Sequence, residues 1–240
     1  MEKFATQIIN YYKSLSEINP NLPEDYKIIN PYTNFTENKL SYAISEFYNK
    51  LYNDTKKRKI IYGSSPARRG TAITGIPFED ANHINEITGY QIHKFSISKG
   101  ASNFLYEVID KYGTKKFYND FYMSFVCPIG IVKKNEKGNL INCNYYESKK
   151  LQSALTELII KSLKIQNQFN IERSICYCIG SGENYQFLSL VNDRYHFFKE
   201  IVPLEHPRYI MQYNYKSKEQ YLKKYLKELN REGEIEKHGR

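Results

Sequence analysis

Three short apolar segments, each ended by glycine or proline, alternate with long helical patterns, and this alternation constrains the fold more than any other feature. The segments cover residues 59–63, 120–128 and 174–180. Between them, apolar residues recur at helical spacing over 102–112 and 146–168. Strands separated by helices pair in parallel through right-handed crossovers. The sequence therefore predicts an α/β fold with three layers, α/β/α, around a central, mostly parallel, four-stranded sheet.

The outer parts of the chain add helices and the fourth strand. Helical spacing predicts helices near 4–15, 36–51 and 217–229, and the apolar run 197–202 predicts the last strand. Because the sequence shows no internal repeat and no linker, we expect one domain over 1–240. Within it we expect a helical part at 1–57, a core at 58–226 and a charged tail at 230–240.

Ligands of open parallel sheets bind in the crevice outside the carboxyl ends of the strands. We therefore expect the loops after Gly63, Phe125, Gly180 and Val202 to converge on one site.

The balance of charge points to a polyanionic partner. The chain carries 35 Lys and Arg against 26 acidic residues, for a net charge of +9. Neutralising phosphates releases counterions, which favours nucleic acid as the partner. A Lys-rich surface that only keeps the protein hydrated is the alternative. The 23 tyrosines supply flat faces with a polar tip, which suit bases or sugars.

Neither membrane insertion nor metal binding is indicated. The N-terminus mixes charged and apolar residues, and no run approaches the roughly 18 apolar residues of a membrane span, so we expect a cytoplasmic protein. Cys127, Cys143, Cys176 and Cys178 form no CxxC pair, so we expect buried thiols and no metal site.

The loop after the first core strand carries the most specific motif. Its frame consists of Gly63, Pro66, Gly70, Thr74, Gly75, Pro77 and Phe78. Further motifs follow the other strands, at 127–130, 180–182 and 203–208. In order and spacing the four resemble motifs of the single-strand-selective monofunctional uracil-DNA glycosylases, a branch of the uracil-DNA glycosylase superfamily, and most closely its bacterial members. The resemblance covers about 58–226.

The resemblance implies a monofunctional DNA glycosylase that flips a base out of DNA and hydrolyses its N-glycosidic bond. His206 would stabilise the departing base, and Ser65 would hold the attacking water. We expect no cofactor, no lyase step and a monomer bound to single- or double-stranded DNA. The implied base pocket comprises Gly63, Ser64, Pro66, Ala67, Arg69, Phe78 and Phe125. The implied DNA contacts are Arg68, Gly180, Ser181, Gly182, Arg208, Tyr209 and Tyr213.

Four positions depart from the family pattern. Ser65 stands where the family has a water-orienting Asn, and Arg69 stands where it has an aromatic that stacks on the base. Ala67 replaces a Gly. Phe125 occupies the position at which animal members read uracil with Asn. We therefore expect a non-uracil, bulky modified base, such as the glycosylated hydroxymethylcytosine of phage DNA, and hence a role in antiviral defence. The alternatives are a repair glycosylase for uracil or another deaminated base, and a catalytically inactive DNA-binding module. Arg68 and Arg69 could serve only phosphate contacts.

Glu79 and Asp80 directly follow Phe78. They are alternative activators of the attacking water. Acidic residues ahead of the apolar pattern 81–88 are, however, typical of a helix N-cap, and we favour that interpretation.

Overall fold

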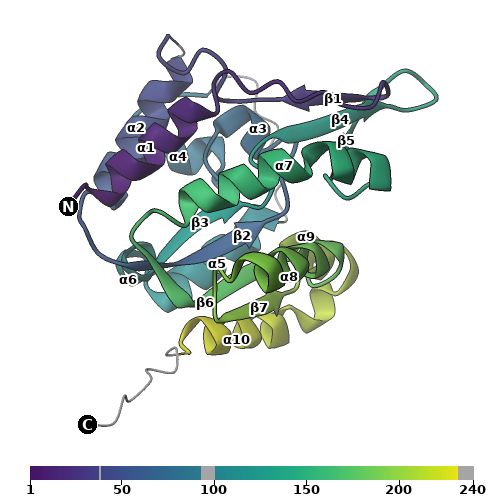
Figure 1. Ribbon diagram of the computed structural model, residues 1–240. Coiled ribbons are helices and arrows are strands. Elements are labelled where there is room, and N and C mark those ends of the chain that lie inside the picture. The colour runs from purple at the N-terminus through teal and green to yellow at the C-terminus, as the bar shows by residue number, and fades with distance from the viewer. Residues whose placement is uncertain (38, 93–100, 232–240) are drawn as a thin grey trace.

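A four-stranded parallel sheet forms the centre of the protein (Figure 1). The structure is a computed structural model that describes residues 1–37, 39–92 and 101–231. The strands are β2 (Arg58–Gly63), β3 (Phe121–Phe125), β6 (Ile171–Ile179) and β7 (Glu200–Leu204), in the order β3-β2-β6-β7. All three pairings are parallel, and Gly63 lies opposite Phe125. The predicted three-layer α/β fold is confirmed.

Helices cover both faces of this sheet. Side chains alternate between the faces along each strand, so Ile61 points to one face and Tyr62 to the other. The first face packs against α5 (Ala101–Tyr112), α6 (Thr114–Asp120) and α10 (Lys218–Leu229). The second is covered by α1 (Phe4–Ser14), α2 (Lys39–Leu51) and α7 (Lys149–Gln166) (Figure 1). On that side the Phe4 and Tyr122 rings lie 5.5 Å apart.

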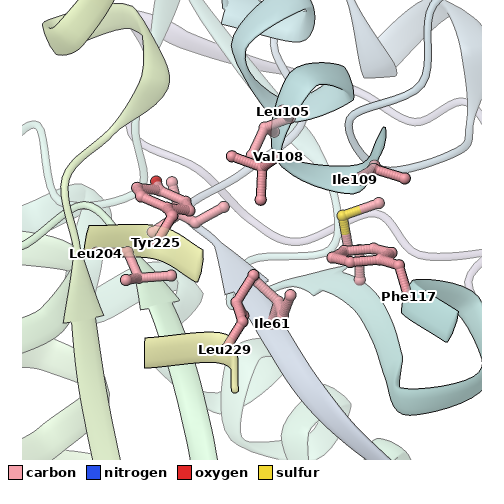
Figure 2. A pocket seen from close by; sticks show the side chains of 10 residues that line it. Ile61, Leu105, Val108, Ile109, Phe117, Leu204, Tyr225 and Leu229 are labelled. Carbon is pink, nitrogen blue, oxygen red and sulfur yellow. The ribbon is translucent and has the colours of Figure 1, made fainter. Parts of the chain in front are cut away.

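A small cavity lies between the first face and the helices α5 and α10 (Figure 2). Its volume is about 10 Å³, and its lining includes Ile61, Val108 and Leu229. A cavity of this size is at the lower limit for one water molecule, which also needs polar partners that this lining lacks. It is therefore a packing gap in the core and not a ligand site.

A second sheet, which the sequence did not predict, extends from the end of β3. It is antiparallel, with the order β1-β4-β5, and comprises β1 (Tyr26–Ile29), β4 (Gly130–Lys134) and β5 (Leu140–Cys143). At Gly130 an added Cβ would lie 2.9 Å from the carbonyl oxygen of Pro66. Glycine thus lets this sheet approach the first motif loop closely.

The remaining helices connect these strands. They are α3 (Thr71–Thr74), α4 (Ala81–Thr88), α8 (Glu183–Tyr195) and α9 (Pro207–Tyr213), with a 3₁₀ turn at Tyr215–Ser217. Several predicted boundaries were wrong by about three residues; the strand predicted from 174, for example, begins at Ile171. The strand predicted at 197–202 is β7, which begins three residues later at Glu200, and the helix predicted from Thr36 begins at Lys39. Of the predicted tail, residues 232–240 lie outside the described part.

The four cysteines are buried, as expected. Burial raises the pKa of Cys127 and of Cys178 to about 12 each, so both remain thiols at neutral pH. Within the described ranges, no helix combines the length and apolar character needed to span a bilayer.

Candidate functional site

The loops that follow the four parallel strands lie at the same edge of the sheet and are joined in two pairs. The loops after β2 and β3 are joined by two backbone hydrogen bonds, from Val126 N to Gly63 O and from Cys127 N to Ser64 O, both 2.9 Å long. The ends of β6 and β7 are joined by a bond of 2.8 Å from Gly180 N to Leu204 O. The sequence motifs therefore lie together at one edge of the sheet.

The first loop buries a hydroxyl group that has no protein partner. Ser65 is 8 % exposed, and its Oγ makes no hydrogen bond to any residue that the structure describes. An unsatisfied buried hydroxyl costs about 1–3 kcal/mol. A water molecule or a substrate atom bound at Ser65 would remove this cost. The neighbouring Ser64 is satisfied, because its Oγ donates to Asn144 Oδ1 at 3.2 Å.

An aromatic wall stands beside this loop. The ring centroids of Phe78 and Phe125 lie 5.3 Å apart. Gly63 lies against both rings, since a Cβ added to it would approach Phe78 Cζ to 2.6 Å and two Phe125 ring atoms to 2.9 Å. Only glycine fits here without displacing a ring. Three predicted pocket residues are thus in mutual contact.

His206 lies after β7 in a conformation that fixes its proton. It is the N-cap of α9, and its Nδ1 accepts a hydrogen bond of 3.0 Å from Arg208 N. The proton of the neutral ring is therefore on Nε2. Burial, followed by the positive charge of Arg208, lowers the pKa of His206 to about 4. At neutral pH His206 is thus a neutral imidazole, and its Nε2–H makes no hydrogen bond to any residue that the structure describes.

Comparison with known proteins agrees with this geometry. A family model described as the uracil DNA glycosylase superfamily matches residues 50–230. The chain belongs to the uracil DNA glycosylase superfamily. It is a DNA glycosylase, an enzyme that acts on N-glycosyl bonds.

A solved structure supports the same assignment for this glycosylase. The crystal structure of wild-type SMUG2 from Pedobacter heparinus is similar to it, with a TM-score of 0.87 and 38% sequence identity. The similarity covers 95% of this chain and 97% of that chain. The resemblance inferred from the motifs is confirmed. No curated protein sequence matches the chain significantly.

The predicted DNA-contacting side chains of the glycosylase lie at the surface around the site. Arg208 is exposed, and the tyrosines of α9 are exposed to 48 % (Tyr209) and 76 % (Tyr213). The two tyrosine rings lie 6.3 Å apart. Tyr209 is therefore not packed in the core. On the first loop, Arg69 and Ala67 are exposed, whereas Arg68 and Phe78 are partly buried and Pro66 is buried.

The turn from β6 into α8 contains the predicted DNA contacts Gly180, Ser181 and Gly182, whose backbone amides could hold a phosphate. Ser181 and Gly182 are exposed there, and Gly182 is the N-cap of α8. The Asn184 side chain fixes the turn, since its Nδ2 donates to Ile179 O at 2.9 Å and its Oδ1 accepts from the Tyr145 hydroxyl at 2.8 Å. Glu183 occupies the first helical turn, and its negative charge opposes an anion at this position.

The two acidic residues after Phe78 have different structural roles. Asp80 is the N-cap of α4, as predicted, and its Oδ1 accepts from Asn82 N at 2.8 Å and His83 N at 3.0 Å. Glu79 is not a cap. Its buried carboxylate contacts the side chains of Tyr118, Tyr106 and His83. These partners enclose Glu79, which argues against activation of a water molecule.

Two asparagines, one in β5 and one directly after it, contact the first loop and were not predicted from the sequence. Asn142 Oδ1 accepts a hydrogen bond of 2.8 Å from Arg68 N, and Asn144 binds Ser64. Because β5 was not predicted, no sequence signal placed these side chains beside the first loop.

Proposed function

We propose that this glycosylase flips a nucleotide out of DNA and excises a base other than uracil, leaving an abasic site. Phe125 carries the proposal. The family resemblance puts the uracil-reading Asn at this position, whereas the Phe125 ring offers no hydrogen bond and packs on Phe78. A polar base edge left unread in a buried site costs about 1–3 kcal/mol. Uracil is therefore a poor fit.

The polar groups of the site favour a base with a hydroxyl-bearing extension. They lie on the first loop and on the segment after β5: Ser65 with its unpartnered hydroxyl, Ser64 bound to Asn144, and the exposed Arg69. Hydroxyl, amide and guanidinium groups can all bind sugar hydroxyls. Glycosylated hydroxymethylcytosine, found in phage DNA, has this chemistry, and its excision would make the enzyme an antiviral defence protein.

In the proposed reaction, flipping exposes C1′, which the stacked duplex would bury. The C1′–N bond breaks, its electron pair leaves with the base, and an oxocarbenium-like sugar remains, by analogy with glycosides. The Nε2–H of neutral His206 donates to the departing base as negative charge develops on it. A water molecule at Ser65 Oγ then adds to C1′ and releases a proton.

Side chains around the site would bind the rest of the DNA. Arg208, which is exposed, and Arg68, which is partly buried, would contact phosphates, and such contacts set affinity without reading sequence. Tyr209 and Tyr213 are large, exposed side chains of α9, the helix that His206 caps, and they would fill the gap left by a flipped nucleotide.

The test is alkali-sensitive abasic-site formation in oligonucleotides of one sequence, single- and double-stranded. The target base would be uracil, hypoxanthine, hydroxymethylcytosine or its glucosylated form. We expect cleavage at the modified cytosine, and its loss in His206→Ala. Faster cleavage at uracil or hypoxanthine would favour the repair alternative. DNA binding without any abasic site would favour the inactive binding module.

A further inference from the structure

Phe78 has a backbone conformation that the surrounding structure must hold in place. Its φ is +64°, in the left-handed region that aromatic residues seldom adopt. Its ring nevertheless packs against Phe125 and against Gly63. Gly63 directly precedes Ser64 and Ser65 in the sequence. A strained residue persists only where its neighbours fix it. The contacts that fix Phe78 therefore shape the pocket wall.

The neighbouring Glu79 provides these contacts. Its Oε1 accepts from the Tyr118 hydroxyl of α6 at 2.9 Å, and its Oε2 accepts from the Tyr106 hydroxyl of α5 at 3.3 Å. His83 Nδ1 of α4 also binds Oε2. Three helices thus hold a carboxylate that is only 3 % exposed. The two tyrosine hydroxyls donate to its two carboxyl oxygens, one to each.

The backbone on both sides of Phe78 is fixed as well. Glu79 N donates to Ile76 O at 3.2 Å, and the Thr74 hydroxyl lies 3.3 Å from both Glu79 O and Ile76 O. Tyr106 also accepts a hydrogen bond of 2.8 Å from Asp80 N, so one hydroxyl binds two successive residues of the turn. The turn has little freedom to rotate Phe78 away from Gly63.

We propose that Glu79 is a positioning residue for base excision, which acts by holding the Phe78 ring at the wall of the base pocket. Glu79 does not touch substrate or water in this role. The inference rests on the proposed function, in which Phe78 lines the pocket. It assigns the buried carboxylate of Glu79 a role other than the activation of water.

A double-mutant cycle tests the inference. On the substrate cleaved fastest by the parent, Glu79→Gln should lower the single-turnover excision rate roughly tenfold, because misplacing a group by about 1 Å can cost up to 10²-fold. The dissociation constant for DNA should stay within about twofold. In a Phe78→Ala background the same change should cost less than about twofold, since the wall that Glu79 holds is already gone. If the double variant loses the product of the two rate factors that Glu79→Gln and Phe78→Ala lose separately, the proposal is overturned.

Tyrosine variants separate positioning from general destabilisation. Tyr118→Phe removes a hydroxyl bonded to Glu79, and Tyr177→Phe removes one bonded to Glu228 O at 2.8 Å on α10. At a temperature well below the melting temperature of both variants, Tyr118→Phe should slow excision, whereas Tyr177→Phe should keep the parental excision rate. Equal rates in both would overturn the proposal. Tyr118→Phe also keeps the test decisive if Glu79→Gln does not fold.

Hydrogen exchange provides a readout that does not depend on catalysis. The amides of residues 76 and 78–80 should exchange faster in Glu79→Gln and Tyr118→Phe than in the parent or Tyr177→Phe. If the parent cleaves no substrate, the proposed function fails and this measurement alone decides the positioning role. Unchanged exchange at residues 76 and 78–80 would overturn it.

Discussion

Adding one methyl group at Gly63 should disrupt the pocket wall. The Cβ of Gly63→Ala would lie 2.6 Å from Phe78 Cζ and 2.9 Å from two Phe125 ring atoms. Carbon atoms pack best about 3.5–4.0 Å apart, so the rings must retreat by about 1 Å. Overpacking of this kind costs about 1–3 kcal/mol. Displacement of the wall should also slow excision, by up to about 10²-fold.

Thermal unfolding and single-turnover excision measure these two effects. For a chain of this size, each kcal/mol lowers Tm by roughly 2–4 °C. Gly182→Ala is the control for an added methyl group that meets no atom within 4 Å, and any loss of stability in it reports only its position as the N-cap of α8. Combining Gly63→Ala with Phe78→Leu, which removes the clashing Cζ, should recover part of the stability but not the excision rate.

The reasoning about the wall would be refuted by two results. One is a Gly63→Ala protein that keeps both the parental Tm and the parental rate. The other is a double variant in which Phe78→Leu restores no stability, since the clash would then lie elsewhere.

Three further predictions concern charge. Because the pKa of His206 is lowered to about 4, titration of this residue should leave the excision rate unchanged between pH 8 and 5 and alter it only near pH 4. His206→Ala should cost about 2–4 kcal/mol of transition-state stabilisation while DNA affinity stays nearly intact. A wild-type-like rate in His206→Ala would contradict this. The hydrogen bonds from Arg58 lower the pKa of Asp54, so Asp54 stabilises the fold above its unfolded pKa, and this stability is lost as pH falls through its lowered folded pKa. In urea unfolding, the free energy of unfolding should therefore fall less steeply with acid in Asp54→Asn than in the parent. An identical pH dependence in both proteins would exclude this linkage. DNA affinity should fall steeply with salt, and Arg208→Ala should reduce the log–log slope by about one without changing base preference; affinity that ignores salt would remove the electrostatic argument.

The sequence predicts the parallel core well because the relevant signals are local. Each core strand is a short apolar run ended by Gly or Pro, and the carboxyl-edge rule then brings Gly63, Phe125 and His206 to one edge. The position of β7 was harder to predict, because Phe198 is apolar yet lies outside the strand. Its backbone N and O bond the Asn192 side chain at 2.8 and 3.0 Å, so they are not available to a neighbouring strand.

The polar half of the site depends on contacts between residues distant in sequence. Asn144 and Ser64 are 80 residues apart, and β5 is short and mostly exposed, so no periodic pattern marks it. Glu79 has a partner 39 residues away in Tyr118. From the sequence alone its carboxylate could equally face solvent, and only the packing of α4, α5 and α6 encloses it.

The proposed preference for a base other than uracil can be measured as a ratio of two single-turnover excision rates. One rate is for a glucosylated hydroxymethylcytosine and the other is for uracil at the same position of the same oligonucleotide. For the parent we expect roughly 5- to 150-fold faster excision of the modified base, because Phe125 leaves the uracil edge unread at a cost of about 1–3 kcal/mol. Phe125→Asn should shift the ratio toward uracil. A parent that removes uracil as fast as the modified base, or faster, would contradict the account.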